Sequence, residues 1–305
     1  MKFVQVIKVI LGFQFITGAL SEGRYLIDTT SCTGDFYNAV KGYMDSAQKW
    51  AEEICDILEP YIQDPSQRPN DRFMDLAFKM FGNNDLQTMM NVHNNRNPWW
   101  TDQERDPGDL EIFCSADHIV HQDNPASPDA AWWDITRDSP VDNDDIALGH
   151  KDPKGTLLAT AHVAVPDGDQ EKFPQHWSEY IVINPYKLRK AVDKGTLFAD
   201  KRVRKASSPS LLSRIRRAYN WHWHDITPVD ILKTLDINMI HELSHLVACG
   251  DAIDVRGDDS YGWDNALAIR QTDNSETLTF FVIIDQLNRH YNLDVDDNGK
   301  IVKIT

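Results

Sequence analysis

Two histidines and a glutamate in one apolar segment, His241, Glu242 and His245, have the spacing of a metal-binding helix. Side chains four residues apart lie on one face of an α-helix, so the imidazoles of His241 and His245 can converge on one ion. Glu242 would lie beside that ion, where a carboxylate can take a proton from a metal-bound water. The pattern is typical of zinc peptidases and predicts one zinc ion per chain.

The segment that carries these residues, 237–247, is apolar on most sides. Such a composition predicts a helix buried inside the protein rather than one lying on its surface. Polar side chains at that depth need a partner, and a metal ion is one.

A catalytic zinc site needs a third protein ligand and leaves a fourth position for water. The loop after the predicted helix offers Asp254, Asp258 and Asp259, and the start of the next predicted helix offers Glu276. The residues alone leave these candidates open.

The stretch Asp258-Asp259-Ser260-Tyr261-Gly262, together with the histidine helix, resembles the signature of the aspzincins. This family comprises deuterolysin and the fungal peptidyl-Lys metalloendopeptidases, whose helix is followed by Gly-Thr-x-Asp-x-x-Tyr-Gly. The resemblance implies that Asp258 is the third zinc ligand and that Tyr261 stabilises the transition state. Val255-Arg256 stands here in place of Gly-Thr, so Asp254 remains the alternative ligand.

The resemblance also implies how a substrate would bind. A strand ahead of the active-site helix pairs with the extended substrate in the family, and residues 180–184 match it here. Asp273 and Glu276 have the Asp-x-x-Glu spacing with which the lysine-specific members bind a substrate lysine. Two carboxylates in a pocket attract an ammonium group, although acidic residues also commonly begin a helix.

Residues 1–21 have the pattern of a signal peptide, with Lys2, an apolar stretch interrupted by Lys8, and small residues before the expected cleavage point. The apolar stretch is too short and too interrupted to predict a membrane span. We therefore expect a secreted, extracellular protein. The four cysteines that follow, Cys32, Cys55, Cys114 and Cys249, predict two disulfides in one of three pairings. The net charge of −16 argues against a nucleic-acid-binding surface.

Hydrophobic periodicity predicts helices over residues 35–62, 71–81, 85–92 and 276–290, and strands over 110–115, 156–165 and 180–185. The expected architecture is one α+β domain over residues 22–305, zincin-like as the resemblance implies, with a small mixed sheet and an active-site helix. Residues 22–105 form a helical part that is either a propeptide-like segment or part of the mature enzyme.

These observations predict a secreted, monomeric zinc endopeptidase that acts on protein or peptide substrates, with a preference for lysine-containing ones. The alternative is a secreted zinc-binding protein or surface antigen without catalysis. It is similar to fungal zinc-scavenging proteins whose related helix has Arg where this chain has Glu242. The presence of Glu242 favours the enzyme.

Overall fold

The computed structural model describes residues 24–95, 101–102, 110–121, 132–136, 139–141, 159–162, 179–195, 198, 200–208, 226–246 and 252–304 of the 305-residue chain. The expected signal peptide and Cys249 lie outside these residues. None of the described helices is both long enough and apolar enough to cross a bilayer.

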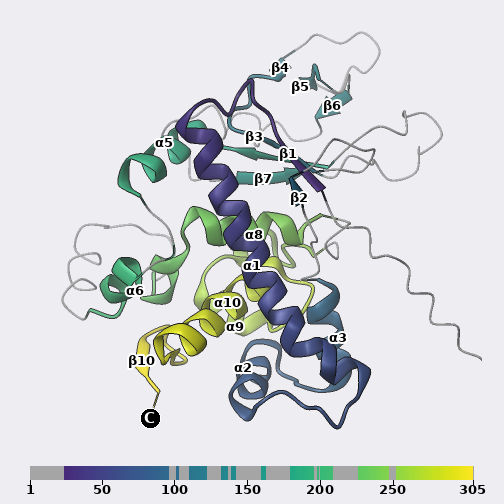
Figure 1. Cartoon of the computed structure of the whole chain (residues 1–305), viewed down its shortest axis with the longest axis vertical. Helices are drawn as coiled ribbons and strands as arrows, with labels where there is room; N and C mark the ends of the chain where they lie inside the picture. Colours follow the sequence, from purple (N-terminus) through teal and green to yellow (C-terminus); the bar gives the residue numbers. More distant parts are fainter. Residues whose placement is uncertain are drawn as a thin grey trace, which may run out of the picture.

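The described chain combines helices with small sheets, which confirms the α+β class (Figure 1). The helices are α1 (Asp35–Gln63), α2 (Asp71–Phe81), α3 (Leu86–Asn94), α5 (Pro185–Lys194), α6 (Asp200–Ala206), η1 (Val229–Leu232), α8 (Leu235–Ser244), η3 (Gly257–Ser260), α9 (Trp263–Ile269), α10 (Ser275–Gln286) and η4 (Leu287–Tyr291). The strands are β1 (Arg24–Ile27), β2 (Thr101–Asp102), β3 (Leu110–Phe113), β4 (Ile119–His121), β5 (Trp132–Asp134), β6 (Ser139–Val141), β7 (Ala159–His162), β8 (Tyr180–Ile183), β9 (Leu293–Val295) and β10 (Ile301–Lys303).

The main sheet has the strand order β2-β1-β3-β8-β7, and only β7 is antiparallel to its neighbour. Side chains alternate across β8: Ile181 and Ile183 face the large core, whereas Tyr180 and Val182 face a smaller apolar cluster. A strand buried on both faces has a continuous apolar sequence, as in this run. The antiparallel sheet β4-β5-β6 contributes Ile119 and Trp132 to the smaller cluster.

Local signals explain where several helices begin and end. The side chain of Asn184 accepts hydrogen bonds from two backbone amides of the first turn of α5, and Pro185 occupies a position that needs no amide donor. Gly195 ends the same helix in the left-handed conformation. The strand that the sequence predicts before Pro185 therefore passes directly into a helix.

The helical front part shares its core with the histidine helix. Figure 1 shows α1 running from the sheet to α2 and α3, across α8 and α10. Buried side chains of α1, α8 and α10 belong to one apolar cluster, and every residue of α10 is buried. The three helices predicted near the N-terminus are confirmed, whereas β1 and β2 were not expected there.

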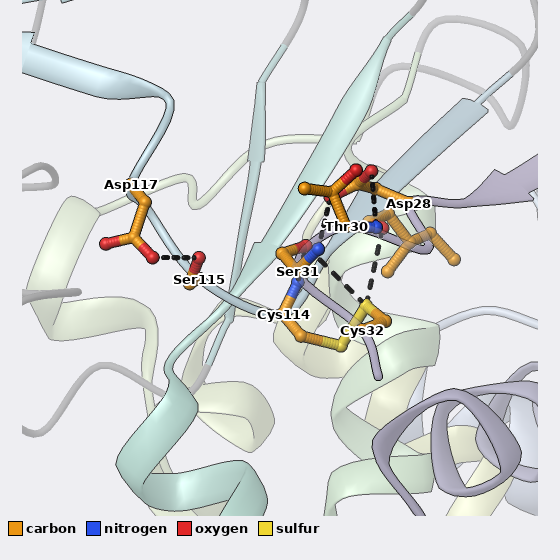
Figure 2. Close-up of a disulfide and its surroundings, with 8 residues drawn as sticks. Asp28, Thr30, Ser31, Cys32, Cys114, Ser115 and Asp117 are labelled. Carbon is orange, nitrogen blue, oxygen red and sulfur yellow. Dashed lines mark hydrogen bonds between the residues drawn. A yellow bond between two sulfur atoms is a disulfide. The ribbon is translucent and has the colours of Figure 1, made fainter. Parts of the chain in front are cut away.

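One disulfide, between Cys32 and Cys114, joins the loops that follow the parallel strands β1 and β3 (Figure 2). Asp28 accepts hydrogen bonds from the backbone amides of Thr30 and Ser31, and the hydroxyl of Ser31 accepts one from the amide of Cys114. This disulfide corresponds to one of the three pairings considered for the four cysteines. Because Cys249 lies outside the described residues, a second disulfide stays a prediction.

Candidate metal centre

The helix α8 brings His241 and His245 together as predicted. The Nε2 atoms of the two imidazoles lie 3.2 Å apart. A third group joins them: Asp254 places one carboxylate oxygen 3.6 Å from His241 Nε2 and the other 3.6 Å from His245 Nε2. These three side chains are a group whose ligand atoms all lie within 4.8 Å of one another.

Asp254 reaches the histidines because the preceding residue is fixed to the start of α10. Ile253 forms an isolated parallel bridge with Asn274, donates its amide to Asp273 O at 2.8 Å and accepts the amide of Ser275 at 3.1 Å. These bonds hold the loop after α8 against the N-terminus of α10. The next side chain along the loop, that of Asp254, then faces the two imidazoles.

The second ring nitrogen of each histidine faces an acceptor of the protein, with a hydrogen bond at His245 and a longer contact at His241. His245 Nδ1 donates to the carbonyl of Ala252 at 2.7 Å, and Ser275 Oγ lies 3.1 Å from the same nitrogen. His241 Nδ1 makes a longer contact, 3.4 Å, with Glu276 Oε2. Metal-ligating histidines commonly present this arrangement, in which Nδ1 faces a carbonyl or carboxylate and Nε2 faces the ion.

The ligand atoms lie close enough together to surround one ion. Ligand atoms about 2.0–2.2 Å from a zinc ion lie roughly 3.3–3.6 Å from one another in tetrahedral geometry. The two Nε2 atoms, 3.2 Å apart, come close to this separation, and Asp254 faces each imidazole with a different oxygen at 3.6 Å. Among the described residues, no hydrogen-bond donor satisfies the buried Oδ1 of Asp254. A bound cation would provide this oxygen with a partner, so the two histidines and Asp254 form a donor set that could hold a metal ion.

The charges around His241 favour its protonated form when no metal is bound. Burial by itself lowers the pKa of His241, but its contacts with Asp254 and Glu276 and the negative charge of Glu242 raise the value to about 9. The pKa of Glu276 is lowered to about 2: burial acts against this shift, and the charge of Lys233 and the contact with His241 produce it. A metal ion that binds here would therefore displace a proton from His241.

Glu242 and Tyr261 both lie near the three ligands. Glu242 is buried and follows His241 on α8, and its charge raises the pKa of both His241 and Tyr261. The hydroxyl of Tyr261 donates a hydrogen bond of 2.8 Å to Asp254 Oδ2, and its ring lies 5.4 Å from that of His241. Tyr261 is 41% exposed, so solvent reaches this side of the site.

Asp258, the ligand implied by the resemblance, lies elsewhere. It is exposed on the short helix η3 and is not a member of the group formed by the two histidines and Asp254. Asp254, the alternative ligand considered from the sequence, is the aspartate that faces the two histidines. The backbone explains this placement, because the loop is bonded to the start of α10 at Ile253 and turns toward solvent as η3 begins at Gly257.

Asp273 and Glu276 do not line a common pocket for a substrate lysine. Asp273 is exposed, whereas Glu276 is fully buried. Both carboxylate oxygens of Glu276 lie 2.7 Å from Lys233 Nζ, and one of them accepts the amide of Gly262 at 2.8 Å. Glu276 is thus occupied by groups of the same chain, on the side of His241 opposite the candidate metal position.

The strand expected to pair with a substrate is also placed differently. Within the described sheet, β8 lies between β3 and β7 and is hydrogen-bonded to both. Its backbone therefore has no edge open to a further strand. The edges of the described sheet are β2 and β7, and β7 packs against α8.

Lys233 is the residue of this site that the sequence does not reveal. It ends η1, one residue before the N-cap of α8, and such a position usually leaves a lysine in solvent. Here its side chain is only 18% exposed because it extends to Glu276. No spacing pattern connects two residues that lie 43 positions apart.

No protein-family model matches the chain, and no curated protein or solved structure matches it significantly. The resemblance to the aspzincins consequently rests on the motif residues and stays a prediction. The roles proposed for individual residues are based on the distances between their side chains.

Proposed function

We propose that this protein is a zinc-dependent endopeptidase whose metal ion is held by His241, His245 and Asp254. The observation that carries the proposal is the convergence of two Nε2 atoms and a carboxylate, at separations of 3.2–3.6 Å, beside the carboxylate of Glu242. Three protein ligands leave a fourth tetrahedral position for water, as in catalytic rather than structural zinc sites. A zincin-like fold and secretion belong to the same proposal.

The chemistry assigned to the chain's own residues follows from their positions. Zinc, when bound, would lower the pKa of a coordinated water and polarise the carbonyl of the scissile peptide. Glu242 takes a proton from the attacking water and passes it to the departing amine. Its burial keeps this proton transfer away from bulk solvent.

Tyr261 is the candidate donor to the developing oxyanion. Its hydroxyl lies beside one of the proposed metal ligands, because it donates a hydrogen bond to Asp254. A hydrogen-bond donor aimed at the developing oxyanion stabilises the transition state. Rotation of this exposed side chain from Asp254 toward the substrate carbonyl would supply that donor.

An extended peptide substrate would pair with β7 instead of β8. This strand is antiparallel to β8, forms an edge of the described sheet and packs on the helix that carries the histidines. Backbone hydrogen bonds along a sheet edge hold a peptide in an extended conformation whatever its side chains are. A preference for lysine is not part of the proposal, because Glu276 is buried and bound to Lys233.

The test is zinc content and cleavage of an unbiased peptide mixture, measured on the wild type, Glu242→Gln and the exposed helix variant Glu59→Gln as a control. We expect one zinc per chain in all three proteins and loss of cleavage in Glu242→Gln alone. The cut sites in the mixture would report the specificity directly. Absence of zinc from the wild type would refute the proposal.

The rival function is zinc binding without catalysis, in a secreted binding protein or surface antigen. The same donor set serves it, since His241, His245 and Asp254 bind an ion whether or not chemistry follows. Zinc in the wild type together with no cleavage by any of the three proteins would favour this function.

A further inference from the structure

A buried charge pair lies directly behind the candidate metal centre. Lys233 Nζ contacts both oxygens of Glu276 at 2.7 Å, and it also lies 5.4 Å from the ring centre of Tyr261 and 5.9 Å from that of Phe280. Glu276 has no exposed surface, and Lys233 has little. A buried carboxylate that loses such a partner becomes an uncompensated charge.

The carboxylate of Glu276 connects three segments that the proposed reaction uses. It faces Nδ1 of the ligand His241 at 3.4 Å, accepts the amide of Gly262 at 2.8 Å and binds Lys233 from the loop before α8. Gly262 follows Tyr261, so the same carboxylate holds the loop of the proposed oxyanion donor. One buried group thus fixes a metal ligand and the tyrosine relative to each other.

We propose that Lys233 is a positioning residue: its ammonium group holds the Glu276 carboxylate against His241 Nδ1 and Gly262, and so preorganises the metal ligand and the Tyr261 loop. This inference rests on the proposed metal site. Outer-shell carboxylates orient the imidazole and strengthen it as a ligand, and their loss typically costs about 10- to 100-fold in metal affinity. Lys233 acts one step further out, by keeping that carboxylate in place.

The pair has a second consequence, for substrate choice. A carboxylate close to a metal centre would attract a lysine side chain of a substrate, but here an ammonium group of the same chain already binds both oxygens.

Removal of the Lys233 side chain would leave a cavity that fits an alkylammonium ion. Because 18% of the side chain is exposed, small ions can enter this cavity from solvent.

The experiment measures zinc affinity by competition with a chromophoric chelator, and the visible spectrum of the Co²⁺-substituted protein. Lys233→Met should weaken zinc binding about 10- to 100-fold and change the cobalt spectrum. The matched control is Lys79→Met: Lys79 has a similar exposure, 20%, but binds Val295 O and Asp297 in the C-terminal hairpin. This control should bind zinc with wild-type affinity.

Two further variants separate positioning from a merely structural role. In Lys233→Ala, propylammonium should restore zinc affinity, whereas propanol, which lacks the charge, should not. The double variant Lys233→Met/Glu276→Gln removes both charges, so it should fold even if Lys233→Met does not. Positioning through the Glu276 carboxylate predicts low zinc affinity in the double variant, whereas wild-type affinity there would show that neither charge acts on the metal ligand.

The outcomes discriminate between this inference and the proposed function. Zinc binding by the wild type with unchanged affinity in Lys233→Met, or with full affinity in the double variant, would overturn the role of Lys233 and leave the peptidase proposal intact. A wild type that binds no zinc would overturn both.

Discussion

At the scale of single residues, the site depends on which aspartate faces the imidazoles. Asp254 and Asp258 are four positions apart in the loop that follows α8, the helix with the two histidines. Asp254 has a buried oxygen beside His241, and its pKa is lowered because contacts with His241, His245 and Tyr261 outweigh the effect of burial. Asp258 is exposed.

Exchange of each aspartate for asparagine tests this assignment. Asp254→Asn should weaken zinc binding by more than about 100-fold, since loss of a direct ligand should exceed the effect of losing an outer-shell partner. Asp258→Asn should bind zinc like the wild type. Equilibrium dialysis against a zinc buffer measures both, and the reverse pattern would support the ligand implied by the family resemblance.

A second prediction concerns the hydroxyl of Tyr261. Tyr261→Phe keeps the ring beside His241 and removes the only group of this side chain that can donate a hydrogen bond. We expect kcat to fall about 100- to 1,000-fold, as for loss of one oxyanion donor, with zinc still bound. Steady-state kinetics and metal analysis on the same preparation check it. An unchanged kcat would exclude Tyr261 from the transition state.

At the scale of elements, the entry to α8 is fixed by the C-terminal hairpin. The carbonyl of Gly299, in the turn between β9 and β10, accepts the amide of Val229 at 3.0 Å. Asp230 accepts hydrogen bonds from the amide and hydroxyl of Thr227 and from the amide of Trp263. The loop before α8, the start of α9 and the hairpin therefore form one hydrogen-bonded unit around the site.

Gly299 is the residue of this unit that tolerates no side chain. Its φ is 70°, and an added Cβ would lie 2.3 Å from Thr227 Oγ1 and 2.8 Å from the ring of Trp263. Gly299→Ala should lower the free energy of unfolding by about 2–4 kcal/mol, from backbone strain and overpacking together. Urea denaturation measures this change.

Substitutions at two other glycines distinguish the contribution of backbone strain from that of overpacking. Gly195 also has a positive φ, 55°, but open space around it, so Gly195→Ala should cost only about 1 kcal/mol of strain. Gly42 is exposed within α1 and uncrowded, and Gly42→Ala should stabilise the helix by about 0.5–1 kcal/mol. Equal losses at Gly195 and Gly299 would show that the hairpin does not press on Thr227.

At the scale of the whole molecule, the front helices and the helix that carries His241 and His245 form one body. Buried residues of α1 pack on α8 and α10, and α2 packs on α10. The Cys32–Cys114 disulfide adds a covalent link from the segment before α1 to the end of β3. The front part thus covers apolar surface that the rest of the chain would otherwise expose to water.

This arrangement predicts how the chain responds to a cut after residue 105, at an inserted protease recognition site. The cut protein should migrate as one species on a non-reducing denaturing gel, retain its zinc and unfold in one transition. The isolated fragment 106–305 should neither fold nor bind zinc, because α8 and α10 lose the surface of α1. Circular dichroism and metal analysis of the fragment check this.

A folded and active fragment 106–305 would contradict the prediction and make residues 22–105 an inhibitory propeptide. The variant Cys32→Ala/Cys114→Ala serves as the control for the covalent link. After the same cut, its two pieces should separate on the non-reducing denaturing gel. Retention of zinc by this variant before the cut would show that the shared core, rather than the disulfide, holds the front part in place.

Local sequence determined the parts of this protein that follow from helical geometry. Four-residue spacing on an apolar helix is enough to bring His241 and His245 together, and periodicity located α1, α2 and α3 within a few residues. The continuous apolar run of β8 also indicates a strand that is buried on both faces. Each of these features depends on residues that are close along the chain.

Only the tertiary structure decided which aspartate faces the histidines, which group binds Glu276 and which strand lies at the sheet edge. Asp254 faces the histidines because Ile253 is bonded to residues 273–275, about 20 positions away, and no pattern within the loop encodes those bonds. Glu276 is occupied because Lys233, from the loop before α8, packs into the same buried space. A buried charge needs an oppositely charged or hydrogen-bonding group beside it in the folded protein. Spacing along the chain does not identify that group.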